Sequence, residues 1–124
     1  MGTLSVFEAE HDVPFAIKRI YYIHDVPAGV QRGGHAHKKL RQVLWCPYGK
    51  ILIKLDDGFE KAEVLLDSAD KGLIVESNMW RDMLWQQDNS VLCVAADSFY
   101  DAADYIRDYE EFLRHVGAQA SVKE

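Results

Sequence analysis

The sequence predicts one all-β domain followed by a single α-helix, and three observations support this fold class. The chain of 124 residues has the length of one domain. Short segments rich in β-branched and aromatic residues follow one another as far as residue 97, with turn signals at roughly every eight to twelve residues. Beyond that point the apolar residues adopt helical spacing. This pattern is typical of a β-sandwich or a β-barrel.

Seven segments of the first 97 residues are expected to be strands, because they carry β-branched, aromatic or alternating apolar residues. They are Ile17–His24, Arg41–Cys46, Lys50–Asp56, Ala62–Leu66, Leu73–Glu76, Met79–Trp85 and Val91–Ala96. The alternation is clearest in the third, where Ile51, Ile53 and Leu55 occupy every second position. Glycine, proline and aspartate favour turns, which are expected at Pro47–Gly49, Asp57–Gly58 and Asp70–Gly72.

The segment from Asp101 to His115 is expected to be a helix that packs on the β-structure. Its apolar residues fall on one face at helical spacing: Tyr105, Ile106, Tyr109, Phe112, Leu113 and Val116. Asp101 and Asp104 suit the helix N-terminus, and Gly117 is the expected stop. Residues 1–124 are therefore predicted to be a single domain, with a β-barrel over about 4–97 and a helix over about 101–116.

The charge balance excludes general binding to a nucleic-acid backbone or to an anionic membrane. Lys and Arg total 14 against 20 Asp and Glu, which gives a formal net charge of −6. No apolar run approaches the roughly 18–20 residues that cross a bilayer, and Met1–Glu10 lacks the features of a secretory signal. Cys46 and Cys93 lie in apolar segments without a CxxC pair, so we expect free thiols in a reducing cytoplasm.

One segment departs from this acidic balance. Residues Gln31–Arg41 (QRGGHAHKKLR) contain Arg32, Lys38, Lys39 and Arg41 and no acid. The local positive charge is compatible with a small anionic ligand. The alternative is a solvated strand edge on which lysines prevent aggregation, and on charge alone this is the more common case.

Two histidines within that segment are the strongest candidates for chemistry. His35 and His37 are two residues apart, so on a strand their side chains share a face. Imidazole takes and returns protons near neutral pH, which suits acid–base catalysis. Gly33 and Gly34 precede them and would let a ligand approach the backbone closely. The alternative for each histidine is an ordinary packed or surface residue.

The strand Ile17–His24 offers a further polar group. Arg19, Tyr21 and Ile23 share one of its faces. The phenol of Tyr21 is a candidate to hydrogen-bond a substrate oxygen or to relay a proton. Packing is the alternative for the Tyr21–Tyr22 pair.

The spacing of the two histidines to Gln42 and Gly49 resembles the first motif of the cupin barrels, in which an acidic residue follows HxH. In metal-binding cupins a histidine from a second motif completes the ligand set. Here Gln42 occupies the acid position, and Arg81 stands where the last histidine is expected. Arginine has no lone pair to offer and repels a cation, so the sequence predicts no metal site.

Four blocks of the chain together resemble one family, the dTDP-4-keto-6-deoxyglucose 3,4-ketoisomerases (WxcM-like) of the cupin superfamily. The blocks are PFAIKRIYYI (Pro14–Ile23), RGGHAHKKLRQVL (Arg32–Leu44), the NMW-x-x-M stretch (Asn78–Met83) and FYDAADYIRDYEEF (Phe99–Phe112). The match runs in one register from about Gly2 to Val116. The HAHKKL and YDxxDYIRxY blocks together are specific.

The resemblance implies a cupin fold, that is, a jelly-roll β-barrel of two antiparallel sheets with a C-terminal α-helix. It also implies a homodimer, a dTDP-linked 4-keto-6-deoxy sugar as substrate, and neither a metal nor another cofactor. The implied reaction moves the carbonyl group from C4 to C3 through an enediol. Its product would be a precursor of 3-amino-3,6-dideoxy sugars in surface glycans such as lipopolysaccharide.

Under this resemblance, His35 is the main base and proton carrier, and His37 orients it or stabilises the oxyanion. Tyr21 hydrogen-bonds the sugar oxygens or relays the second proton. The remaining contacts are expected from Arg19, Arg32 and Lys39 at the diphosphate, Gly34 beside the ligand, Tyr22, Tyr48 or Trp80 against thymine or sugar, and Arg81 at a phosphate or sugar oxygen. Core packing is the alternative for Trp80.

Three other functions stay open at this point. They are a non-catalytic cupin that binds a nucleotide sugar, a sugar-nucleotide epimerase, and a metal-dependent cupin enzyme such as a dioxygenase.

Overall fold

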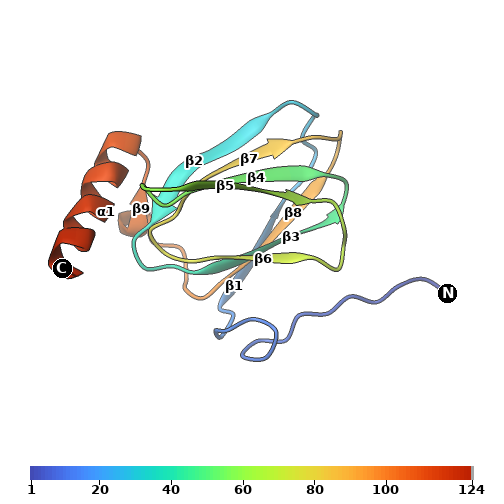
Figure 1. The fold of residues 1–124 in the computed structure, drawn as a ribbon. Helices are drawn as coiled ribbons and strands as arrows, with labels where there is room; N and C mark the ends of the chain where they lie inside the picture. The colour runs from blue at the N-terminus through green and yellow to red at the C-terminus, as the bar shows by residue number, and fades with distance from the viewer. Residues whose placement is uncertain (124) are drawn as a thin grey trace.

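Two facing antiparallel sheets and one C-terminal helix make up the computed structural model, which describes residues 1–123 and their side chains as far as Gln119 (Figure 1). The strands are β1 (Arg19–Ile23), β2 (Gln31–His37), β3 (Gln42–Tyr48), β4 (Ile51–Asp56), β5 (Lys61–Leu66), β6 (Gly72–Val75), β7 (Trp80–Trp85), β8 (Val91–Ala96) and β9 (Tyr105–Ile106). A 3₁₀ turn, η1 (Ala102–Asp104), precedes β9, and the helix α1 spans Tyr109–Lys123.

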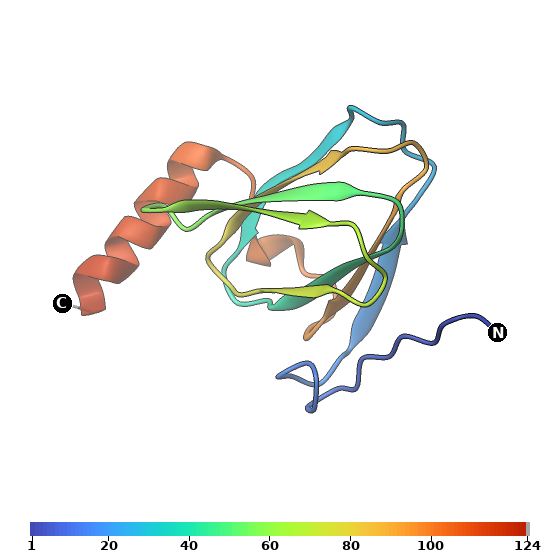
Figure 2. The ribbon, with the colours of Figure 1, turned by 45° about the vertical axis from the view of Figure 1, so that its right-hand side comes forward.

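The strand pairing is that of a jelly roll. Strand β1 pairs with β8, β2 with β7, β3 with β6 and β4 with β5, as if one long hairpin had been rolled up. The resulting sheets have the orders β1-β8-β3-β6 and β5-β4-β7-β2-β9. They face each other as a sandwich and do not join into one closed barrel (Figure 2). The predicted all-β class with two antiparallel sheets and a C-terminal helix is therefore confirmed.

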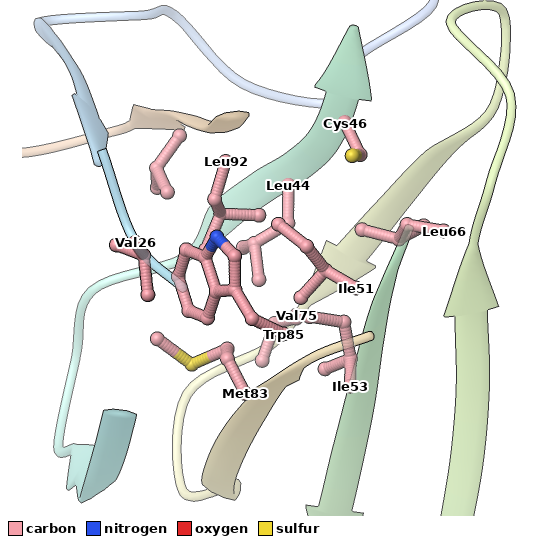
Figure 3. Packing of buried hydrophobic residues seen from close by; sticks show 11 residues of the cluster. Val26, Leu44, Cys46, Ile51, Ile53, Leu66, Val75, Met83, Trp85 and Leu92 are labelled. Carbon is pink, nitrogen blue, oxygen red and sulfur yellow. The ribbon is translucent and has the colours of Figure 1, made fainter. Parts of the chain in front are cut away.

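The main core fills the space between the sheets and is centred on Trp85, which is 1% exposed. Figure 3 shows the apolar side chains of both sheets converging around its indole ring. The indole nitrogen donates to the carbonyl oxygen of Ser90 at 2.8 Å, so the polar atom of this buried side chain is satisfied. The expected alternation in β4 is confirmed, because Ile51 and Ile53 point into this core with 0% exposure.

The expected strands are found with ends shifted by a few residues, and the histidine segment forms β2. The predicted barrel span of about 4–97 was too long at its start, because β1 begins at Arg19 and the residues before it form an isolated bridge between Ala9 and Val13. Cys46 and Cys93 are free thiols, as predicted. Among the described residues, none of the helical segments combines the length and hydropathy that a membrane crossing requires.

The prediction for the C-terminal segment was wrong at both ends of the helix. The helix begins at Tyr109 instead of Asp101, because Tyr105 and Ile106 form β9, which pairs with Ala36 and His37 at the edge of β2. Ile106 is completely buried there, packed against Ala36 and the helix residue Phe112. The helix also continues through Gly117, since one internal glycine costs a helix only about 1 kcal/mol.

The helix packs at one end of the sandwich, beside β2 and β9 (Figures 1 and 2). Phe112 and Val116 form a second apolar cluster there with Ala36 and Ile106. Trp80 lies against this cluster, with its ring 5.6 Å from that of Phe112. The core-packing alternative for Trp80 therefore holds.

Candidate active site

The C-terminal half of β2 carries the histidines and is shaped by a bulge. The register with β7 shifts between Gly33 and His35, and both glycines there have positive φ, 101° at Gly33 and 71° at Gly34. A Cβ atom on Gly33 would lie 2.7 Å from the carbonyl oxygen of Arg81. Only glycine fits this conformation and this approach. The bulge ends where the next residue, His35, pairs with Arg81.

His35 and His37 lie together in the interior with Tyr105 beside them. The two imidazole rings meet edge to face with 5.1 Å between their centroids. The ring of Tyr105 is 4.3 Å from that of His37 and 5.2 Å from that of His35. His37 is fully buried and His35 is half-buried, so His35 is the more accessible of the two.

Asp104 holds His37 in a defined orientation. One of its carboxylate oxygens, Oδ2, lies 3.2 Å from Nδ1 of His37, and both oxygens accept hydrogen bonds from the backbone of Lys39 and Leu40. A carboxylate accepts only, so Nδ1 of the neutral ring carries the proton and Nε2 carries the lone pair. Nε2 is buried and has no hydrogen-bond partner among the described residues. It is therefore a free acceptor inside the site.

Both imidazoles are neutral at pH 7. Burial, with the positive charge of Arg81, lowers the pKa of His35 to about 4 and that of His37 to about 3. A neutral imidazole is the form that accepts a proton.

Arg81, Gln42 and Tyr21 form a hydrogen-bonded chain that connects the two sheets. Nη1 of Arg81 donates to Oε1 of Gln42, and Nε2 of Gln42 donates to the Tyr21 hydroxyl oxygen at 3.1 Å. Arg81 is 1% exposed and also donates to the carbonyl oxygen of Met79. Burial raises the pKa of the Tyr21 phenol, against the hydrogen bond from Gln42, so Tyr21 is protonated at neutral pH.

A cavity of about 310 Å³ opens beside this chain. It is lined by Arg19, Ile20, Tyr21, Tyr100 and Tyr105. Larger hollows of about 320 and 520 Å³ lie elsewhere, and neither is lined by a residue whose ring contacts the two histidines, whereas Tyr105 in the wall of the 310 Å³ cavity contacts both. We therefore place the candidate site where Tyr21 and Tyr105 meet the histidines.

Arginine side chains surround this cavity. The guanidinium of Arg19 lies 5.0 Å from the Tyr21 ring centre and 5.6 Å from that of Tyr100. Its Nε is buried without a partner among the described residues. Arg107 lies over the Tyr105 ring at 4.3 Å. The surroundings of the cavity thus suit an anionic ligand.

The structure brings several of the predicted site residues together and separates others. Arg19, Tyr21, His35, His37 and Arg81 converge. Gly34 lies at the bulge beside them. Arg32, Lys39 and Tyr48 are exposed and do not line the cavity.

Tyr22 was predicted to contact substrate, and the structure does not support this. Its ring faces away from the interior, 64% exposed and 5.5 Å from the His24 ring, because neighbouring residues of a strand point to opposite faces.

Sequence reasoning missed the contributions of Asp104, Tyr105 and Arg107 to the site. All three lie in the segment that helical spacing assigned to a helix. The signal that points to them is the YDxxDYIRxY block, which contains all three.

The donor set does not fit a metal ion. In the described part of the chain, no group of three or more His, Cys, Asp or Glu side chains has the geometry of a metal site. The buried guanidinium of Arg81 lies close enough to both histidines to lower their pKa. A cation there would be repelled.

Comparison with known proteins identifies the family. The family model described as FdtA, WxcM-like, C-terminal, matches residues 1–117. The chain belongs to the FdtA family. A curated relative, the TDP-4-oxo-6-deoxy-alpha-D-glucose-3,4-oxoisomerase of Aneurinibacillus thermoaerophilus, is 43% identical over 115 residues, which cover 93% of this chain and 83% of the relative.

Solved structures agree with the FdtA assignment. A 3,4-ketoisomerase from Helicobacter canadensis is 44% identical with a TM-score of 0.90, covering 94% of this chain and 87% of that one. A variant of the ketoisomerase QdtA from Thermoanaerobacterium thermosaccharolyticum, in complex with TDP-4-keto-6-deoxyglucose, is 37% identical with a TM-score of 0.89, covering 93% and 83%. The rmlC epimerase of Mycobacterium tuberculosis, at 22% identity and a TM-score of 0.64, shares the fold alone.

Proposed function

We propose that this protein is a sugar-nucleotide 3,4-ketoisomerase that converts dTDP-4-keto-6-deoxyglucose to a dTDP-3-keto-6-deoxyhexose. The observation that carries the proposal is the pair of neutral imidazoles, His35 and His37, beside the protonated phenol of Tyr21 at a cavity with arginine in and beside its wall. The FdtA-family relative that is 43% identical acts, by its name, on the same sugar.

The reaction requires two hydrogen transfers. One hydrogen leaves C3 and one arrives at C4, while the hydroxyl proton at O3 is lost and O4 gains one. His35 is the base that takes the C3 proton to give the enediol and returns it at C4. Its half-buried position lets it reach a ligand, and its lowered pKa keeps it neutral at pH 7.

Tyr21 supplies the donor to the oxygen at C4. Charge develops on that oxygen when the C3 proton leaves, and a fixed phenol proton stabilises it. Tyr21 lines the cavity, and its raised pKa keeps the proton in place until it is needed.

His37 acts as an acceptor. Its Nδ1 proton is directed to Asp104, so the neutral ring has no N–H to offer an oxyanion. Of the two roles expected from the sequence, oxyanion stabilisation therefore lacks a donor, and the role we propose for His37 is that of an acceptor toward the substrate. The free Nε2 atom would accept the hydrogen bond of the C3 hydroxyl and then its proton as the ketone forms at C3, while the Tyr21 phenol gives a proton to the oxygen at C4. Return of one proton from His37 to Tyr21 through solvent would restore both groups, so the net change is the isomerisation of the sugar alone.

The diphosphate would bind to the arginines. Arg19 lies in the cavity wall and Arg107 beside it, over Tyr105. Arg32 and Lys39 are exposed near the ends of β2 and would add longer-range attraction.

The test is incubation of the purified protein with dTDP-4-keto-6-deoxyglucose in D₂O, followed by proton NMR and by coupling to a 3-aminotransferase. We expect a 3-keto product. Binding of the nucleotide sugar without turnover would favour the non-catalytic alternative. Activity that is lost with a chelator and restored by a metal ion would favour a metal-dependent enzyme.

The expected pathway and cellular location of the protein follow from the same proposal. The product would be a precursor of 3-amino-3,6-dideoxy sugars in surface glycans, made in the cytoplasm, where free thiols such as Cys46 and Cys93 persist.

Two copies would pair through the outer face of the four-stranded sheet, where Ile20 and Tyr22 are 61% and 64% exposed. Light scattering after size exclusion tests for a dimer, and a monomer would contradict it.

A further inference from the structure

We propose that Gln42 is a positioning residue of the ketoisomerase, one that fixes the direction of the hydrogen bond at Tyr21 so that the phenol proton is left for the substrate. This inference rests on the proposed function. It gives a role to a side chain that the metal-binding pattern leaves unexplained, since Gln42 occupies the position at which that pattern has an acid.

Arg81 determines which way the amide of Gln42 points. Gln42 is 1% exposed, so solvent contacts neither the oxygen nor the NH₂ group of its amide, and the neighbouring side chains alone fix the orientation of the amide. Its neighbour Arg81 has only donors, and therefore the atom of Gln42 that faces Arg81 is the carbonyl oxygen. The NH₂ group must then face Tyr21, 3.1 Å from the phenol oxygen.

The amide in turn determines what Tyr21 can do. The phenol oxygen accepts from Gln42, so the phenol proton is not used in this hydrogen bond. In the described residues the Tyr21 hydroxyl finds no other acceptor, and Tyr21 lines the cavity. The proton is thus available to an oxygen atom of a bound sugar.

A glutamate in place of Gln42 would reverse the direction of the hydrogen bond at Tyr21. A carboxylate accepts only, so it would still pair with Arg81 but would draw the phenol proton toward itself. Tyr21 would then present a lone pair to the cavity. The stability of the fold would be maintained while the donor to the substrate oxygen is lost.

The experiment compares Gln42→Glu, Gln42→Met and wild type by kcat, KM and thermal unfolding. We expect Gln42→Glu to lower kcat roughly 100-fold with little change in KM, since one donor to a developing oxyanion is lost. In Gln42→Met the phenol proton stays available but no hydrogen bond fixes its direction, so we expect a smaller loss of kcat, about tenfold. Gln86→Glu, at an exposed position, is the matched control for the change of charge and should keep wild-type activity.

A purely structural role for Gln42 predicts the opposite order. Gln42→Met removes the side-chain acceptor of the buried Arg81 guanidinium, whereas Gln42→Glu keeps an acceptor for it. Activity that follows stability across the variants would therefore overturn the proposal.

A double-mutant cycle keeps the test decisive if either variant folds poorly. In a Tyr21→Phe background there is no phenol proton to direct, so a Gln42 substitution should cost no further activity. Additive losses would overturn the inference. A wild-type protein without turnover would instead overturn the proposed function. A fully active Gln42→Glu protein would overturn only the positioning role of Gln42.

Discussion

Asp104 places its Oδ2 atom 3.2 Å from Nδ1 of His37, although the two residues are 67 positions apart in the chain. The pairing of β9 with β2 brings them together, since Tyr105 lies opposite His37 in that ladder. Asp104 thereby sets the tautomer of a buried ring whose other nitrogen is a free acceptor.

Asp104→Asn is expected to lower kcat on the order of 100-fold. The amide oxygen would keep the shorter backbone hydrogen bond, that of Lys39 at 2.8 Å, and give up that of Leu40 at 3.3 Å, so the NH₂ group would face His37 and donate to Nδ1. The proton of the neutral ring would then move to Nε2, and the acceptor would be lost. Steady-state kinetics measure the effect. Asp101→Asn, in the exposed cap of the same turn, is the matched control and should stay within a fewfold of wild type.

His35→Asn should reduce turnover of dTDP-4-keto-6-deoxyglucose by roughly 100-fold or more, the usual effect of removing a general base. NMR in D₂O also reports exchange at C3, and this signal should disappear with turnover. His24→Asn changes an exposed histidine outside the site and should leave both signals intact. Near-full isomerisation by His35→Asn would exclude this residue as the base.

The architecture was predictable because each β-segment carries a local signal. Alternating apolar residues such as Ile51 and Ile53 and turns such as Asp57–Gly58 identify a strand without knowledge of its partner. The HxH pair was visible for the same reason, since two residues at i and i+2 share a face in any strand.

Half of the site was not predictable from periodicity, because it depends on contacts between distant segments. Tyr105 and Ile106 fit a helical pattern as well as a short strand, and only the exposed edge of β2 decides between them. Asp104 was accordingly assigned to a helix N-terminus. Gln42 was counted as a missing metal ligand, and its part in the chain between Arg81 and Tyr21 depends on side chains from both sheets.

Gly33→Ala should destabilise the fold by about 1–3 kcal/mol and also impair the site. The new Cβ atom would lie 2.7 Å from the carbonyl oxygen of Arg81, so β7 must shift beside His35. Gly29→Ala separates the cost of the positive φ from the cost of the steric clash. Gly29 also has a positive φ, 89°, but a Cβ atom there meets nothing within 4 Å. Urea unfolding should show a larger loss for Gly33→Ala, and equal losses would mean that the contact with Arg81 does not matter.

The buried histidines make stability depend on pH in a direction that their pKa values fix. An imidazole in the unfolded chain has a pKa of about 6.5, whereas in the fold the values are about 4 for His35 and about 3 for His37. Between these values the unfolded state binds more protons, so stability falls as the pH drops from about 7 toward 4 and is unaffected by these groups above pH 7.

The variant His35→Asn isolates this contribution. It removes one of the two buried groups, so the melting temperature should fall less steeply between pH 7 and pH 5 than in wild type. Most carboxylates stay ionised in that range, which keeps their titration out of the comparison. Identical slopes for the two proteins would show that the pKa of His35 is not lowered in the fold, which would contradict the burial effect on its imidazole.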